Sequence, residues 1–166
     1  MRVISSSRPH RVLLAAGGIA ALAALLAPAA AFADAWSSNK GKIFVSGAEF
    51  GQGFASDGAM VSAMKKQSTS AIKGDGGAWN LNFMVFLKEA PGASTVNIVY
   101  YDITKKRDQV NYSEVSVKPD QKIVQLNGIA ISKDLGFVKG HKYEVLATRL
   151  IGGKEKVYAK TVMTLK

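Results

Sequence analysis

The chain has 166 residues, of which 48% are hydrophobic and 20% charged, a composition typical of a folded protein rather than a disordered one. Once an N-terminal leader is set aside, this length favours one core of ordinary size over two separate domains. The absence of cysteine excludes disulfides and a lipid-modified N-terminal cysteine. The formal net charge is +10.

The N-terminal residues follow the order of segments found in a secretory signal peptide. Three arginines precede an uncharged stretch over residues 12–26, and two Ala-x-Ala sites come after it. The uncharged stretch is shorter than the roughly 20 residues that a membrane-spanning helix needs, which disfavours the alternative of an uncleaved anchor. We therefore expect residues 1–33 to be a removable signal peptide, with cleavage after Ala33 or Ala35, and a periplasmic or secreted product.

The segment after the leader is predicted to begin with a flexible lead-in over residues 34–41, followed by a single domain over 42–166. Residues 42–46 have the composition of a short strand. Ser56 is a typical helix N-cap, and after it apolar residues recur at helical spacing with two lysines near the end. These signals predict one short helix over residues 57–67.

From residue 79 onward the apolar residues alternate, which indicates strands rather than helices. We expect strands over 79–88, 96–100 and 110–117, two strands within 123–131 separated by Asn127-Gly128, and a final hairpin of 143–151 and 156–165 joined by Gly152-Gly153. One face of the first of these strands carries Trp79, Leu81, Phe83, Val85 and Leu87, and one side of the last carries Val157, Ala159, Thr161, Met163 and Leu165.

The segment Phe137-Val-Lys-Gly-His-Lys-Tyr143 resembles the tyrosine corner of immunoglobulin-like and fibronectin type III-like sandwiches. The resemblance implies that the Tyr143 ring is packed and that its hydroxyl bonds to backbone just upstream. Together with the strand pattern it predicts a mainly β protein, an antiparallel β-sandwich of immunoglobulin-like type with one short helix near its N-terminal side. The segment over residues 42–72 is not explained by this resemblance.

Few residues are suited to catalysis. Behind the leader, His141 is the only histidine, and it lies in a predicted turn, where we expect a solvated side chain. Zinc sites and histidine-based nucleophilic triads need more ligands or a neighbouring nucleophile and acid. The sequence therefore predicts no catalytic, cofactor-binding or metal-binding residues, no cofactor, and a protein that is not an enzyme; a small secreted hydrolase is a distant alternative.

One cluster has the composition of a binding surface. Lys105, Lys106 and Arg107 lie at a predicted hairpin tip shortly after Tyr101, and cationic groups beside an aromatic ring are typical of polyanion-binding surfaces. The alternative is that the three charges solvate a turn. We expect a non-catalytic exported protein that acts by binding an unknown envelope protein, or else an anionic glycan, lipid or nucleic acid through this tip.

Overall fold

The computed structural model describes residues 35–166. The predicted signal peptide and its cleavage after Ala33 lie outside the described residues. The described part of the chain is mainly β, with these elements in chain order: β1 (Ile43–Ser46), α2 (Asp57–Gln67), β2 (Ala71–Ile72), β3 (Ala78–Phe86), β4 (Thr95–Asp102), β5 (Asp108–Ser116), β6 (Ile123–Ser132), the short 3-10 helix η1 (Lys133–Leu135), β7 (Lys142–Ile151) and β8 (Lys154–Leu165).

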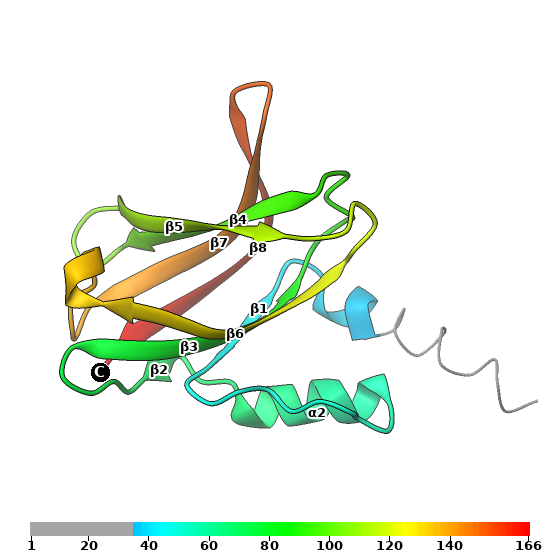
Figure 1. Ribbon diagram of the computed structural model, residues 1–166, viewed down its shortest axis with the longest axis horizontal. Helices are drawn as coiled ribbons and strands as arrows, with labels where there is room; N and C mark the ends of the chain where they lie inside the picture. The colour runs from blue at the N-terminus through cyan, green and yellow to red at the C-terminus, as the bar shows by residue number, and fades with distance from the viewer. Residues whose placement is uncertain (1–34) are drawn as a thin grey trace, which may run out of the picture.

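The strands form two sheets that face each other across the main core (Figure 1). The three-stranded sheet has the order β1-β3-β6, and the five-stranded sheet has the order β2-β8-β7-β4-β5. Neighbouring long strands are antiparallel, whereas the two-residue β2 runs parallel to β8. Both sheets contribute buried side chains to one apolar cluster, an arrangement compatible with the expected β-sandwich.

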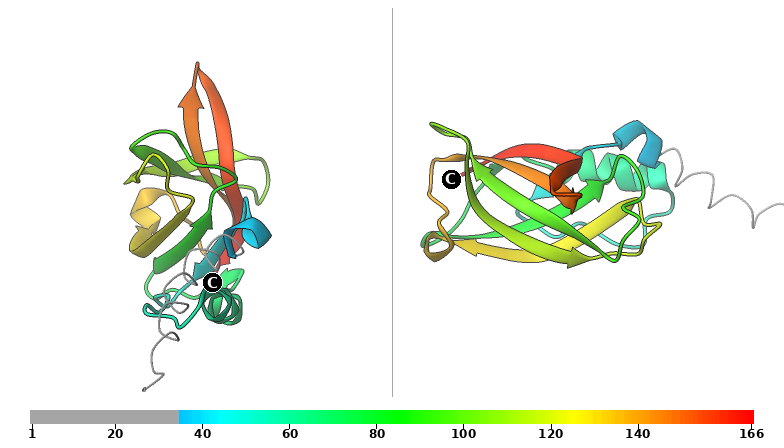
Figure 2. Two further views of the ribbon diagram at one scale, coloured as in Figure 1. Left: turned by 90° about the vertical axis from the view of Figure 1, so that its right-hand side faces the viewer. Right: turned by 90° about the horizontal axis from the view of Figure 1, so that it is seen from above.

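Strand β3 lies in the centre of the three-stranded sheet, as its alternating sequence predicts, and is buried on both faces from Leu81 onward. Its predicted inner face belongs to the main core, whereas Met84 and Phe86 on the other face pack with Phe50 and Met64 in a second cluster. Met64 belongs to α2, so the helix covers the outer face of this sheet (Figure 2). The predicted helix bounds are confirmed, and Ser56 Oγ accepts a hydrogen bond from Ala59 N at 3.2 Å.

The two strands expected within residues 123–131 are wrong, because β6 runs unbroken through Asn127-Gly128. Asn127 and Gly128 on β6 lie opposite a single residue of β3, Asn82. The extra residue on β6 makes a β-bulge at this point of the pairing. Gly128 takes a φ of 69°, and its N–H donates to Asn82 Oδ1 at 2.9 Å. The Asn-Gly pair, which is typical of a turn, therefore forms a bulge within one strand.

The final hairpin is confirmed, with Gly152 and Gly153 at φ values of 58° and 77° between its strands. The prediction that Val157 shares one side of β8 with Ala159, Met163 and Leu165 is wrong, because a bulge opposite Ala147 and Thr148 shifts the alternation. Tyr158 is buried in the main core, and Val157 is not among its members. One extra residue in a strand moves every side chain on one side of the bulge to the opposite face of the sheet.

The expected lead-in over residues 34–41 is structured rather than irregular from residue 35 onward. Residues 35–39 are helical, and Asn39 is 1% exposed. The Trp36 indole Nε1 donates to the Leu87 carbonyl at 2.6 Å. The Trp36 side chain therefore attaches this stretch to the end of β3. The contact joins residues that are 51 positions apart, so local sequence patterns do not reveal it.

The local geometry implied by the tyrosine-corner resemblance is present. Tyr143 lies at the start of β7, is fully buried, and its hydroxyl oxygen accepts a hydrogen bond from Val138 N at 2.7 Å. The ring packs against Phe137, with ring centroids 5.3 Å apart. This contact anchors the connection that leads from η1 into β7.

Candidate functional site

Of the four residues predicted to form a binding tip, Tyr101 and Arg107 are in contact. The Arg107 guanidinium lies over the Tyr101 ring, 3.5 Å from its centroid. Arg107 Nε is 2.9 Å from Glu144 Oε2, and the Lys106 ammonium is 3.4 Å from Asp108. Two of the three cations thus have carboxylate partners, which reduces the attraction of the tip for an anionic polymer.

Lys105 is exposed and makes no ion pair within the described part of the chain. It borders a shallow recess of about 290 Å³. Acidic and basic groups share this recess, so it presents no strong field of either sign. Its lining comprises Asp102, Thr104, Lys105, Lys106, Asp108, Val110 and His141.

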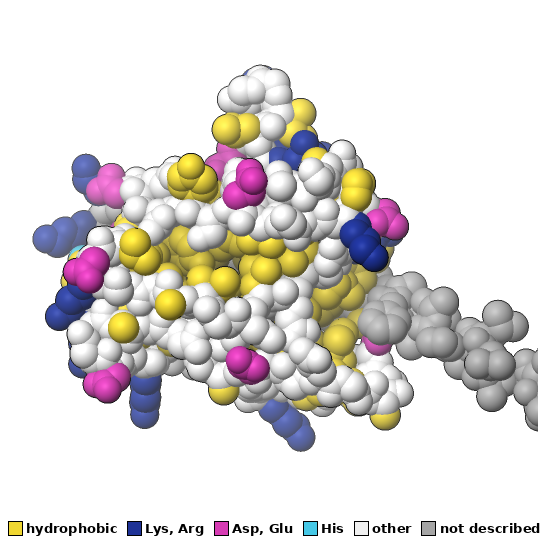
Figure 3. Space-filling model, viewed as in Figure 1, with side chains coloured by type: hydrophobic (Ala, Val, Ile, Leu, Met, Phe, Trp, Pro, Cys, Tyr) yellow, Lys and Arg dark blue, Asp and Glu magenta, His cyan; other side chains and the backbone are white. Residues whose placement is uncertain are grey.

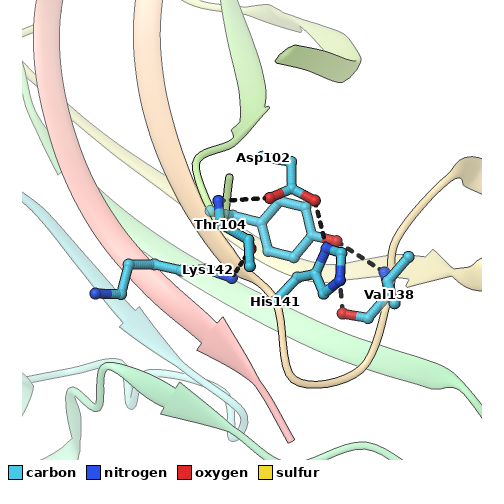
Figure 4. Close-up of polar contacts among 6 residues, drawn as sticks. Asp102, Thr104, Val138, His141 and Lys142 are labelled. Atoms are coloured by element: carbon cyan, nitrogen blue, oxygen red, sulfur yellow. Dashed lines mark hydrogen bonds and ion pairs between the residues drawn. The ribbon is translucent and has the colours of Figure 1, made fainter. Parts of the chain in front are cut away.

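His141 is not the freely solvated loop side chain that the sequence suggests. Its Nδ1 lies 2.5 Å from Asp102 Oδ2, and only 33% of the side chain is exposed (Figure 4). The second carboxylate oxygen, Oδ1, accepts a hydrogen bond from Thr104 N at 2.8 Å. The pair forms because Asp102 ends β4 directly opposite Tyr143 at the start of β7, two positions beyond His141. A separation of 39 residues hides this contact from local sequence patterns.

The Asp102 carboxylate is held in its ionised form. Burial by itself would raise the pKa of Asp102, but the hydrogen bonds from His141 and Thr104 outweigh burial and lower this pKa below its usual value. The Thr104 hydroxyl accepts from Lys142 N at 2.9 Å, so it too is part of the connection between the β4–β5 turn and β7 (Figure 4). These contacts join the β4–β5 turn to the start of β7, and Thr104, the hydroxyl side chain that lines the recess, takes part in them.

A second surface, which sequence reasoning missed, lies between the edges of the two sheets. Strands β5 and β6 are each the last strand of their sheet, and they run along the same side of the molecule (Figures 1 and 2). Apolar side chains gather in a hollow between them (Figure 3). We call this hollow the β5–β6 trench; the partly exposed side chains that border the main core there are Val110, Val115, Val117, Leu126 and Ile129.

The trench is the place where the main core is incompletely covered. In the described residues, every partly buried member of the main core lies on β5 or β6 or directly after β5. Strand register confirms their direction, since Val115 pairs with Val96 and Leu126 pairs with Phe83, which both point inward. Sequence patterns could not reveal this surface, because the sequence of an edge strand does not differ recognisably from that of other strands. Only the tertiary structure shows it.

Comparison of the chain with protein-family models, with curated proteins and with solved structures finds no match. Within residues 35–166, no group of three or more histidine, cysteine, aspartate or glutamate side chains is placed to hold a metal ion. The same residues contain no helix that is both long enough and apolar enough to cross a membrane.

Proposed function

We propose that this protein is an exported, non-catalytic domain of the immunoglobulin-like class that binds an extended segment of a partner protein in the β5–β6 trench. The observation that carries the proposal is the trench itself, an apolar hollow bordered by two edge strands of nine and ten residues. Exposed, contiguous apolar surface of this kind is characteristic of interaction sites.

The chemistry of the trench favours a polypeptide over a small apolar ligand. An edge strand presents a row of backbone N–H and C=O groups on its free side, and β5 and β6 both present such a row toward the opening. A small apolar molecule would cover the side chains and leave these groups without partners. An added strand would pair with one edge and turn every second side chain toward the core. The expected partner segment is therefore extended, with apolar residues at alternate positions.

The strand order supports the immunoglobulin-like assignment. Leaving out the short β2, the first, second and fifth strands in chain order form one sheet, and the third, fourth, sixth and seventh form the other. This division matches a sandwich whose strands A, B and E face strands C′, C, F and G. The hydrogen bond between Tyr143 and Val138 adds the tyrosine corner at the expected end of strand F.

Export and the absence of catalysis rest on separate arguments. The signal-peptide pattern of residues 1–33 supports a periplasmic or extracellular location, so the partner is sought in the cell envelope or outside the cell. The involvement of His141 and Thr104 in contacts with Asp102 and Lys142 supports a structural role for the groups that could otherwise act in catalysis.

Two substitutions on one strand test the proposal. Ser113 pairs with the core residue Ile98 and so faces the trench, whereas Ser116 pairs with Thr95 and faces away. Both serines are exposed, so lysine at either position adds the same charge without removing a packed side chain. Ser113→Lys places an ammonium in the apolar hollow, and Ser116→Lys is the matched control.

The assay is quantitative co-isolation from the envelope fraction of the producing cells, followed by hydrogen exchange on the purified complex. The wild type and Ser116→Lys should retain the same protein, Ser113→Lys should lose it, and binding should slow amide exchange in β5 or β6. Equal retention by both variants, or slowed exchange confined to other strands, would contradict binding in the trench.

A further inference from the structure

A cluster of lysines, which the sequence analysis did not single out, lies where the N-terminal segment meets the ends of three strands. All five side chains are exposed. They come from the segment before β1, from the residues directly after β3 and before β6, and from the middle of β8. We call the cluster the lysine patch; its members are Lys40, Lys42, Lys88, Lys122 and Lys160.

Backbone contacts bring these positions together. Lys160 N donates to the Gly41 carbonyl at 3.0 Å, and Lys42 forms a β-bridge with Lys160. On the other side, Leu87 N donates to the Lys122 carbonyl at 2.9 Å, which places the residue after Leu87 beside the start of β6. The cluster is therefore a product of the fold and not of adjacency in the chain.

The lysine patch is not neutralised within the described residues. None of its five ammonium groups takes part in an ion pair there, and Glu89, the acidic residue next to Lys88, is bound by Lys156 at 2.5 Å. The hairpin tip differs, because its Lys106 and Arg107 have carboxylate partners. Within the described residues, the patch thus brings together five cations that have no carboxylate partner, whereas the tip has one such cation, Lys105.

The aromatic residue in the patch favours a lipid surface over a nucleic acid or a glycan. The Lys40 and Lys122 ammonium groups each lie 4.2 Å from the Trp36 ring centroid. These contacts occupy the ring surface that a base or a sugar would need for stacking. A half-buried indole flanked by ammonium groups is instead suited to the headgroup region of a bilayer, where tryptophan is enriched.

The type of cation points the same way. The patch contains lysine and no arginine. A lysine ammonium is a compact point charge, whereas the planar guanidinium of arginine binds phosphate groups of fixed geometry through two hydrogen bonds. Mobile headgroups need only such point charges. We infer that the lysine patch docks this protein on membranes that contain anionic phospholipids, which leaves the β5–β6 trench as a separate surface.

Vesicle sedimentation tests this inference with the complete exported chain. The probes are vesicles of phosphatidylglycerol, with phosphatidylcholine vesicles as the uncharged reference. The test variant is Lys88→Gln with Lys160→Gln, and the matched control is Lys105→Gln with Lys106→Gln, which removes the same charge at the hairpin tip. Thermal unfolding of each variant confirms that it is folded before binding is compared.

Each lysine near an anionic membrane contributes about fivefold in affinity. We therefore expect the patch variant to bind phosphatidylglycerol vesicles roughly 25-fold more weakly, and the tip variant to change by about twofold or less. Binding should also weaken as salt is added, and Trp36 fluorescence should shift to the blue on the vesicles.

Three results would overturn the inference. One is equal binding to phosphatidylcholine and phosphatidylglycerol vesicles, and another is an equal loss in both variants. The third is tighter binding to heparin or duplex DNA than to phosphatidylglycerol vesicles under the same salt, which would indicate a polymer rather than a membrane as the partner. Ser113→Lys should leave vesicle binding intact, so failure of the membrane inference and failure of trench binding are distinguishable.

Discussion

The same substitution at two buried tyrosines should lower stability at one position and not at the other. Tyr143 and Tyr100 lie on neighbouring strands and are 0% and 2% exposed. The Tyr143 hydroxyl accepts from Val138 N at 2.7 Å, whereas the Tyr100 hydroxyl has no hydrogen-bond partner among the described residues. Replacement by phenylalanine keeps both rings and deletes only the hydroxyl groups.

The expected change in the free energy of unfolding depends on whether the removed hydroxyl group had a hydrogen-bond partner. Tyr143→Phe removes the acceptor of the part-buried Val138 N–H, and the loss of such a hydrogen bond costs about 1 kcal/mol. Tyr100→Phe removes a polar group that burial already disfavours, so the free energy of unfolding should stay the same or rise by about 1 kcal/mol. The same burial raises the pKa of Tyr100.

Urea denaturation followed by tryptophan fluorescence measures both variants, with calorimetry as a second method. For a domain of this size, about 1 kcal/mol corresponds to a shift of roughly 3–6 °C in the melting temperature. Tyr143→Phe should melt lower than the wild type, and Tyr100→Phe should melt at the same temperature or higher. If the two variants lost similar stability, hydrogen bonding of the hydroxyl would not be what distinguishes these positions.

Three further predictions concern the backbone and the Asp102 contact. Gly128→Ala should cost about 1 kcal/mol in urea denaturation, because the bulge needs a φ of 69° while an added Cβ meets no atom within 4 Å; a far larger loss would indicate a clash instead. Gly58→Ala, within the first turn of α2, should raise stability by about 0.5 kcal/mol on the same assay, since alanine favours helix and its Cβ finds ordinary contacts. The lowered pKa of Asp102 stabilises the folded state above the usual aspartate value of 3.8, and this contribution is lost as pH falls through the folded pKa. Asp102→Asn should therefore be less stable by about 1 kcal/mol near neutral pH and should lose less stability on acidification, whereas an unchanged acid transition would argue against the contact with His141.

Local signals in the sequence determined much of the secondary structure. The helix over residues 57–67 was predictable because its cap, apolar spacing and terminal lysines all act within a few positions. The final hairpin was predictable because Gly152-Gly153 can adopt the left-handed φ values that a two-residue turn requires. Likewise, the short segment before Tyr143 sufficed to predict its hydrogen bond to upstream backbone.

Non-local contacts decided the remaining features. Bulges moved Gly128 from a turn into β6 and brought Tyr158 into the core, because register depends on the partner strand and not on the strand itself. The contact between Asp102 and His141 depends on β4 and β7 being neighbours in the sheet.

The two proposed surfaces belong to this second category. The sequence of β5 mixes valine with serine and asparagine on its inward face, and only the order of the strands shows that this face borders an uncovered opening. The cations at residues 105–107 are adjacent in sequence, yet two of them are neutralised by carboxylates. The lysine patch collects cations from distant segments, because charge acts through space and the fold sets the distances. The sequence by itself thus determined how strongly basic the chain is, and only the tertiary structure decided where that charge remains free to act.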